Sequence, residues 1–256
     1  MGTSNAFGGS TVWSDTSDQW TNATTGAEGT ATTVAPPAPL IQAIGKALGR
    51  GDRRGKSFNV ADLISSLRGG AGSSGSGDGR DSGASPTFTR QAARGALVLG
   101  ALRAIENGET PELESFGLDF SALHELTGRE LLAALIQLIL GSPSHPEDVA
   151  LQRSLQAALQ AETAGSPSSM KDLVGRFVSG LAWQTALVQI TALGKGQAPP
   201  KGGFRALEQR MKTYIAGKVN RIGELLVSSS PQVLANYAST LAAKVCKAFR
   251  SETGAI

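Results

Sequence analysis

The chain is poor in the residues that build most catalytic and metal sites. Its 256 residues include one cysteine, Cys246, and two histidines, His124 and His145. One cysteine excludes an internal disulfide framework and fits a reducing compartment. Two histidines leave almost no ligands for zinc or copper. Aromatic residues make up 5% and glycine accounts for 32 positions, which indicates that part of the chain does not pack into a core.

Long hydrophobic runs and sequence motifs are scarce too. The longest apolar stretch, 131–140, is interrupted at Gln137 and has about half of the roughly 20 residues that a membrane helix needs. The N-terminus lacks the basic region and apolar run of a signal peptide. There is no phosphate-binding loop motif, HExxH zinc motif or GxSxG nucleophile motif. We therefore expect a cytoplasmic protein that is not an enzyme and holds no cofactor or metal.

The few candidate reactive side chains favour structural roles. His124 has no serine or cysteine nucleophile pattern beside it, so we predict a position on the surface or at the start of a helix. His145 precedes a proline, which predicts a loop. Cys246 falls on the apolar face of a helical pattern, which favours a buried structural thiol.

Charge is segregated along the chain. Residues 1–45 have a net charge of −3, residues 46–105 of +6, residues 106–172 of −8 and residues 173–256 of +8. Blocks of opposite sign favour one of two arrangements. Either acidic and basic helices dock within one molecule, or copies of the chain meet head to tail.

Residues 86–256 are predicted to form an all-α domain of five or six helices. Apolar residues recur there at three- and four-residue spacings, and no comparable run alternates with period two. Thr127 and Glu130 fit a capping box before 131–140, and that segment is apolar nearly all round, so we place it at the centre of the core. Pro146 and Pro231 stand where helices begin. The expected helices cover about 88–105, 131–140, 146–159, 170–190, 204–226 and 231–249.

Residues 1–85 are predicted to form a flexible N-terminal arm. Ser, Thr, Gly and Ala dominate 10–35, a composition typical of disorder, and a proline-rich spacer follows at 35–39. Short helices are expected at 40–48 and 59–68. The Gly/Ser stretch 69–85 is typical of a linker and gives the clearest domain boundary in the chain.

Two basic segments indicate contact with phosphate or with an acidic partner. Residues 49–56 include Arg50, Arg53 and Arg54 among three glycines, with a solvated loop as the alternative. Residues 205–221 hold a basic stripe but lack the interleaved aromatic residues of a protein that binds single-stranded nucleic acid. The alternatives for this stripe are a solvated helix face or a docking surface for the acidic segment 106–172. Together the two segments predict an alternative function as a nucleic-acid-binding or nucleoprotein-like helical protein. The stripe consists of Arg205, Arg210, Lys212, Lys218 and Arg221.

The first nine residues form a small, uncharged tip with one aromatic, Phe7. The initiator methionine is removed when the second residue is as small as glycine, which predicts a free Gly2 amine. An α-amine titrates near ~7.7–8.0, so a useful fraction is neutral and nucleophilic at cellular pH. Ala6 occupies the position where a myristoylation signal needs serine or threonine, so we expect no lipid there. Beyond the tip, Trp13 and Trp20 either pack back onto the domain or anchor a partner protein.

Several short segments, at the tip and in the helical domain, match the sequence outline of one known family. They are Met1-Gly2-Thr3-Ser4 and Gly8-Gly9, then Gly95-Ala96-Leu97, Leu118-Asp119 and Ser121-Ala122-Leu123. With the basic glycine-rich stretch, the linker and the helical domain, they resemble the QatB component of bacterial Qat antiphage systems. One departure concerns the segment after the tip, where relatives have a Leu-Val-Pro-x-Trp-like stretch. Here Ser10-Thr11-Val12-Trp13 keeps the tryptophan and lacks the proline.

The resemblance implies a non-enzymatic subunit that works with three others: a P-loop ATPase, a QueC-like enzyme of 7-deazapurine chemistry and a TatD-like metal nuclease. It further implies that the QueC-like partner attaches a deazaguanine group to the Gly2 amine. Neighbouring and basic residues would then contact partners. These residues are Thr3, Ser4, Phe7, Trp13, Trp20, Arg50, Arg53 and Arg54.

Overall fold

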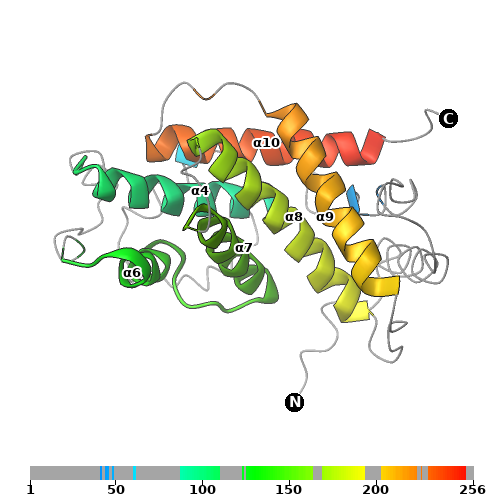
Figure 1. The fold of residues 1–256 in the computed structure, drawn as a ribbon, viewed down its shortest axis with the longest axis horizontal. Helices are drawn as coiled ribbons and strands as arrows, with labels where there is room; N and C mark the ends of the chain where they lie inside the picture. The colour runs from blue at the N-terminus through cyan, green and yellow to red at the C-terminus, as the bar shows by residue number, and fades with distance from the viewer. Residues whose placement is uncertain are drawn as a thin grey trace, which may run out of the picture.

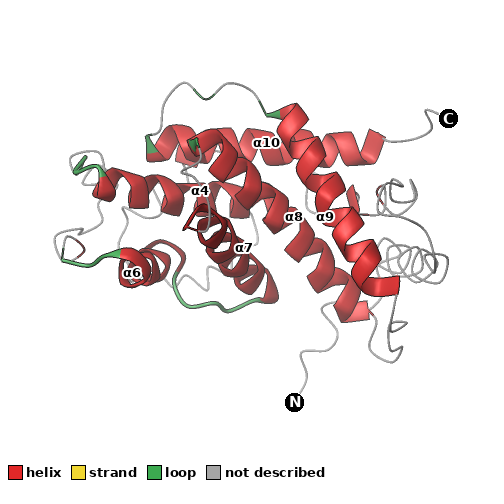
Figure 2. Ribbon diagram, viewed as in Figure 1, coloured by secondary structure: helices red, strands yellow, loops and turns green. Residues whose placement is uncertain are grey.

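The computed structural model describes residues 87–109, 123, 125–163, 169–193, 203–223, 226 and 230–251, and six positions nearer the N-terminus. Those six are Ile41, Ile44, Gly45, Leu48, Val60 and Ala61. The long described segments form six helices and no strand, which confirms the all-α prediction for this part of the chain (Figures 1 and 2). The helices are α4 (Thr87–Glu106), α6 (Gly128–Leu140), α7 (Pro146–Thr163), α8 (Met170–Leu193), α9 (Gly203–Ile222) and α10 (Pro231–Ser251).

Most predicted helix ends are confirmed. Gly108 follows α4 with a φ of 74°, a left-handed conformation that glycine adopts without strain. Pro146 and Pro231 are the first residues of α7 and α10, where the missing N–H costs nothing. The carbonyl of Ser230 accepts the first backbone hydrogen bond of α10, from Leu234 N at 3.0 Å.

The centre of the fold is α4, which packs against α6, α7, α8 and α10 (Figure 1). Small residues make this possible, because they let neighbouring helices approach from several sides at once. Its sequence shows no single apolar stripe, since small apolar residues lie all round the helix. The buried small residues of α4 include Ala92, Ala93, Gly95, Ala96, Gly100, Ala101 and Ala104.

Two glycines of α4 set the closest helix contacts. A Cβ atom on Gly95 would lie 2.0 Å from Cζ of Phe177, so the ring of this α8 residue rests on the bare backbone of α4. A Cβ atom on Gly100 would lie 2.6 Å from Cα of Pro231 at the start of α10. Both distances are far below van der Waals contact, so only glycine allows these two approaches.

The prediction that 131–140 lies at the centre of the core is wrong. In α6, Leu131, Leu135, Ile136 and Ile139 are buried, whereas Gln137 is exposed and several leucines are half-buried. The helix lies at the edge of the fold, against α4 (Figure 1). Hydrophobicity all round a helix does not reveal how many neighbours it has, and α4 has more of them.

None of the described helices is long and apolar enough to cross a membrane.

The predicted capping box at the start of α6 is also not formed. Thr127 is the N-cap residue, but its side chain makes no capping hydrogen bond. The backbone N–H of Glu130 instead donates to the Thr127 carbonyl at 3.2 Å. Gly128, directly after the cap, has a φ of 53°, and this left-handed conformation departs from the geometry that a capping box requires.

The described positions near the N-terminus belong to the same core as the six helices. Ile41, Ile44, Leu48 and Val60 are buried in it. A Cβ atom on Gly45 would lie 2.7 Å from the backbone carbon of Phe249, so the chain at this point lies directly on the last turns of α10. The linker 69–85, the spacer 35–39 and the tip lie outside the described residues.

We predict that Gly100→Ala lowers the free energy of unfolding by about 1–3 kcal/mol, because the added methyl group would meet the backbone of Pro231. Urea unfolding followed by circular dichroism measures the change. Gly217→Ala in α9 is the matched control, since nothing lies within 4 Å of a Cβ atom there. Better helix propensity should stabilise that variant by up to about 1 kcal/mol. Equal effects of the two substitutions would contradict the close approach of α4 and α10.

Candidate functional site

The residues predicted to be modified or to bind partners lie outside the described residues. This holds for Gly2, Thr3, Ser4, Phe7, Trp13, Trp20, Arg50, Arg53 and Arg54, and also for His124. The candidate site in the described part is a polar network where α4 meets the connection between α6 and α7.

Asp148 organises this connection from the first turn of α7. Its Oδ2 atom accepts three hydrogen bonds, each of 3.2 Å, from Ser144 N, Ser144 Oγ and His145 N. His145 is the residue before the helix, so the carboxylate satisfies backbone N–H groups that the helix itself leaves without partners. A negative charge at this end is also favoured by the helix dipole.

Two residues one turn apart on α4 hold the other side of the carboxylate. Arg94 Nη1 lies 3.5 Å from Asp148 Oδ1, and Gln91 Nε2 donates to the same oxygen at 3.2 Å. Arg94 Nη2 also donates to the carbonyl of Leu140, the last residue of α6, at 2.8 Å. One guanidinium thus joins α4 to the C-terminus of α6 and to the N-terminus of α7, with charges matched to both helix dipoles.

Burial and hydrogen bonding act in opposite directions on the pKa of Asp148. Burial is the largest influence and raises the pKa, but the hydrogen bonds from Gln91, Ser144 and His145 and the charge of Arg94 together outweigh it, so the pKa is lowered. Burial also lowers the pKa of the Arg94 guanidinium, partly offset by the charge of Asp148. The side chains of Arg94 and Asp148 are 17% and 18% exposed, so the pair is partly shielded from solvent.

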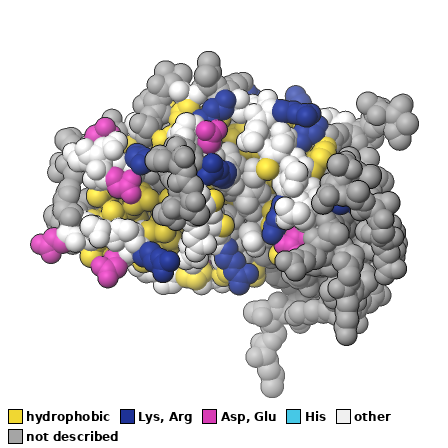
Figure 3. Space-filling model, viewed as in Figure 1, with side chains coloured by type: hydrophobic (Ala, Val, Ile, Leu, Met, Phe, Trp, Pro, Cys, Tyr) yellow, Lys and Arg dark blue, Asp and Glu magenta, His cyan; other side chains and the backbone are white. Residues whose placement is uncertain are grey.

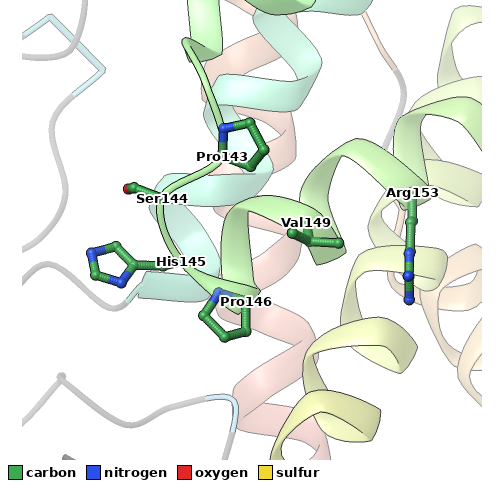
Figure 4. A pocket seen from close by; sticks show the side chains of 6 residues that line it. All are labelled: Pro143, Ser144, His145, Pro146, Val149 and Arg153. Carbon is green, nitrogen blue, oxygen red and sulfur yellow. The ribbon is translucent and has the colours of Figure 1, made fainter. Parts of the chain in front are cut away.

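Ser144, His145 and Asp148 have the residue types of a catalytic triad but not its geometry. In a triad the imidazole bonds both the serine hydroxyl and the carboxylate. Here Ser144 Oγ donates directly to Asp148, and His145 reaches the same carboxylate through its backbone N–H. The imidazole points away from Val149 and Arg153, toward the outside of the loop (Figure 4). The arrangement caps the start of α7 and does not activate the serine.

A shallow, open hollow of about 430 Å³ lies beside this network (Figure 4). Its polar groups are on Ser144, His145 and Arg153, all of them exposed. The positive end of α7 is already occupied by the Asp148 carboxylate, so the hollow offers no second anion position there. It is lined by Pro143, Ser144, His145, Pro146, Val149 and Arg153.

The described residues contain no group of three or more His, Cys, Asp or Glu side chains placed to hold a metal ion. Cys246 is buried on α10 and forms no disulfide, which confirms its predicted position. His145 is exposed in the α6–α7 connection, again as predicted. Comparisons with protein-family models, with curated proteins and with solved structures find no match to this chain.

The sequence pattern anticipated this network only in part. Charge segregation left two arrangements open, docking within the molecule or head-to-tail contact between copies, and Arg94 with Asp148 is a contact of the first kind. The acidic first turn of α7 was also visible in the sequence. The choice of Arg94 as the partner was not, because it depends on how α4 crosses the α6–α7 connection.

We predict that Asp148→Asn lowers the free energy of unfolding at pH 7 by about 1–3 kcal/mol, because charge-assisted hydrogen bonds are lost. The folded pKa lies below the ordinary value of 3.8, so the unfolded chain binds the proton more readily. The contribution of the carboxylate is therefore complete above that value and is lost as the pH falls below it. Urea unfolding at neutral and acid pH should show the two proteins converging in acid.

The exposed pair Arg103–Glu106 provides the control for this experiment. Its side chains are 32% and 46% exposed, at an Nη1 to Oε2 distance of 3.3 Å. Surface pairs of this kind contribute about 0–1 kcal/mol. Glu106→Gln should accordingly change stability little at pH 7, and an effect as large as that of Asp148→Asn would contradict the role given to burial.

Proposed function

We propose that the protein is a cytoplasmic, non-enzymatic subunit of a bacterial antiphage complex, of the QatB type, and that its N-terminal Gly2 is the substrate of a partner enzyme. The helical domain serves as carrier and adaptor, and the N-terminal segment presents the amine to be modified. The partners are a QueC-like enzyme, a P-loop ATPase and a TatD-like nuclease of the same system.

The observation that supports a carrier function is where the N-terminal segment joins the domain. Ile41, Ile44 and Leu48 are buried, and Arg250 Nε donates to the carbonyl of Gly45 at 3.3 Å. The segment is therefore attached at the C-terminal end of α10. The roughly 40 residues between Gly2 and Ile41 can span at most about 130–140 Å when fully extended. That length lets the amine reach an active site on another protein while the domain stays bound elsewhere.

The chemistry requires only a neutral amine and an activated acceptor. The Gly2 nitrogen would attack the carbon of an activated 7-deazaguanine carboxylate, the activating group would leave, and the nitrogen would lose one proton to give an amide. Addition to a nitrile would instead give an amidine with no leaving group. An α-amine, with a pKa near ~7.7–8.0, suits either reaction better than a lysine.

Contacts with the partners are assigned to the N-terminal segment as well. Thr3, Ser4 and Phe7 would enter the modifying enzyme with Gly2, since they adjoin it in sequence. Trp13 and Trp20 suit hot-spot contacts, because tryptophan is enriched at such positions. The basic segment 49–56, with Arg50, Arg53 and Arg54, would meet an acidic partner surface.

The alternative function, a nucleic-acid-binding helical protein, relies on two basic segments. Residues 49–56 lie outside the described residues, while helix α9 of the second segment is described. The alternative competes with the carrier function only if phosphate binding is the whole activity, since an adaptor subunit can also contact nucleic acid.

Intact-mass measurement of the protein co-expressed with its neighbouring genes tests the proposal. We expect a mass increase corresponding to one deazaguanine group, with fragmentation placing it on Gly2. Gly2→Glu should abolish the increase, because a large second residue prevents removal of Met1 and leaves no glycine amine. His145→Ala, in the exposed α6–α7 connection, is the control and should keep the full mass increase. An unmodified Gly2 in a system that still protects against phage would contradict the proposal.

A further inference from the structure

The last three helices hold most of the positive charge of the described structure. α8 has two basic residues and one acidic, α9 has five and one, and α10 has three and none, for a net charge of +8. α4, α6 and α7 together are neutral, with five basic residues (three, one and one) against five acidic residues (one, one and three). A field of one sign over three adjacent helices attracts a polyanion.

The structure divides the predicted stripe of α9 between two sides of the helix. Lys212 lies on the α8 side, with Nζ 5.6 Å from the ring centre of Trp183 and 2.6 Å from Glu208 Oε1. Arg210, Lys218 and Arg221 lie on the other side, at spacings of eight and three residues that keep them on one face. Tyr214 stands between them, and Lys218 Nζ lies 5.8 Å from its ring centre.

This side of α9 adjoins α10. The rings of Tyr214 and Phe249 have centroids 6.2 Å apart, and a Cβ atom on Gly223 would lie 3.0 Å from the hydroxyl of Tyr237. The stretch of α10 between Tyr237 and Phe249 therefore runs along the same flank, and it includes Lys244 and Lys247. Lys247 is exposed and Lys244 is half-buried.

We define the basic α9–α10 face by these side chains. In Figure 3, Lys and Arg side chains are spread over the visible face, including its upper right, whereas most Asp and Glu side chains lie toward the left. The face has five cations and an aromatic ring within two neighbouring helices. Its members are Arg210, Tyr214, Lys218, Arg221, Lys244 and Lys247.

We propose that the basic α9–α10 face binds the phosphate backbone of a nucleic acid, without reading its sequence. Arg210 and Arg221 are eleven residues apart, or about 16 Å along the helix axis. Duplex DNA presents one phosphate charge per ~1.7 Å of its axis, so a backbone alongside α9 supplies an anion for every cation of the face.

The competing occupant is the acidic end of a second copy, whose described residues match the charge of the face less well. Glu106, Glu109, Glu125 and Glu130 are exposed at that end, but Arg103 bonds Glu106 at 3.3 Å and Arg129 adjoins Glu130 in sequence. Among the described residues, these four carboxylates with two cations between them carry less negative charge than the five cations of the face would need. A nucleic acid backbone has no such deficit.

Fluorescence anisotropy with a labelled duplex DNA, and separately with a duplex RNA, tests the proposal on the full chain expressed alone. We expect wild-type affinity to fall steeply between about 50 and 200 mM salt, as phosphate contacts require. The variant Arg210→Gln/Lys218→Gln/Arg221→Gln should lose about tenfold or more in affinity, and the slope of log K against log salt should become shallower by about 2–3.

A matched control distinguishes the effect of this face on affinity from the effect of net charge. Arg90→Gln/Arg129→Gln/Arg153→Gln removes three exposed arginines from α4, α6 and α7, and so changes the net charge by the same amount. It should keep affinity within about threefold and leave the salt slope unchanged. Should the first variant fail to fold by circular dichroism, Arg221→Gln/Lys247→Gln, with two exposed side chains, replaces it and should lower the slope by about 2.

Three results would overturn the proposal. They are no binding of either duplex by wild type at about 50 mM salt, equal losses in the two triple variants, or a face variant that alters only self-association in sedimentation at low salt. The last result would assign the face to contact between copies. Because the protein is expressed without its neighbouring genes, none of these results depends on modification of Gly2.

Discussion

The fold depends on how closely other helices approach α4. Its bare backbone at Gly95 receives the ring of Phe177, and at Gly100 it receives the first residue of α10. These contacts place α8 and α10 on α4, and α9 then packs against both of them. Because α10 is fixed at Pro231 by α4 and lies against Gly45 near Phe249, it connects the N-terminal segment to the centre of the domain.

Polar chemistry in the described residues is concentrated in fastening helices together. Arg94 and Asp148 bond backbone groups at the ends of α6 and α7 that would otherwise be unsatisfied, and Gln91 Nε2 donates to the Asp148 carboxylate. Ser144 and His145 are held there by the same carboxylate. In the described residues, this polar network serves to fix the α6–α7 connection against α4.

Most of the positive charge of the described helices lies in the last three, α8, α9 and α10. α9 and α10 pack through apolar residues such as Ile215 and Val245, and their cations lie on the flanks and outer faces. An adaptor with a modified N-terminus at one end of its chain and a phosphate-binding face on its helical domain would bring a modifying enzyme and a nucleic acid to the same complex.

The sequence by itself determined the helical class, most helix ends and the buried position of Cys246, because these follow from local periodicity, proline and glycine positions and apolar patterning. It did not determine which helix is central, and the apolar run 131–140 was the wrong choice. Centrality depends on the number of neighbours, and the small residues of α4 that admit them have little hydrophobic signal. Tertiary structure alone paired Arg94 with Asp148 and separated Lys212 from Arg210, Lys218 and Arg221. Both results depend on how the helices cross, and the crossing is set by packing between residues that are distant in sequence.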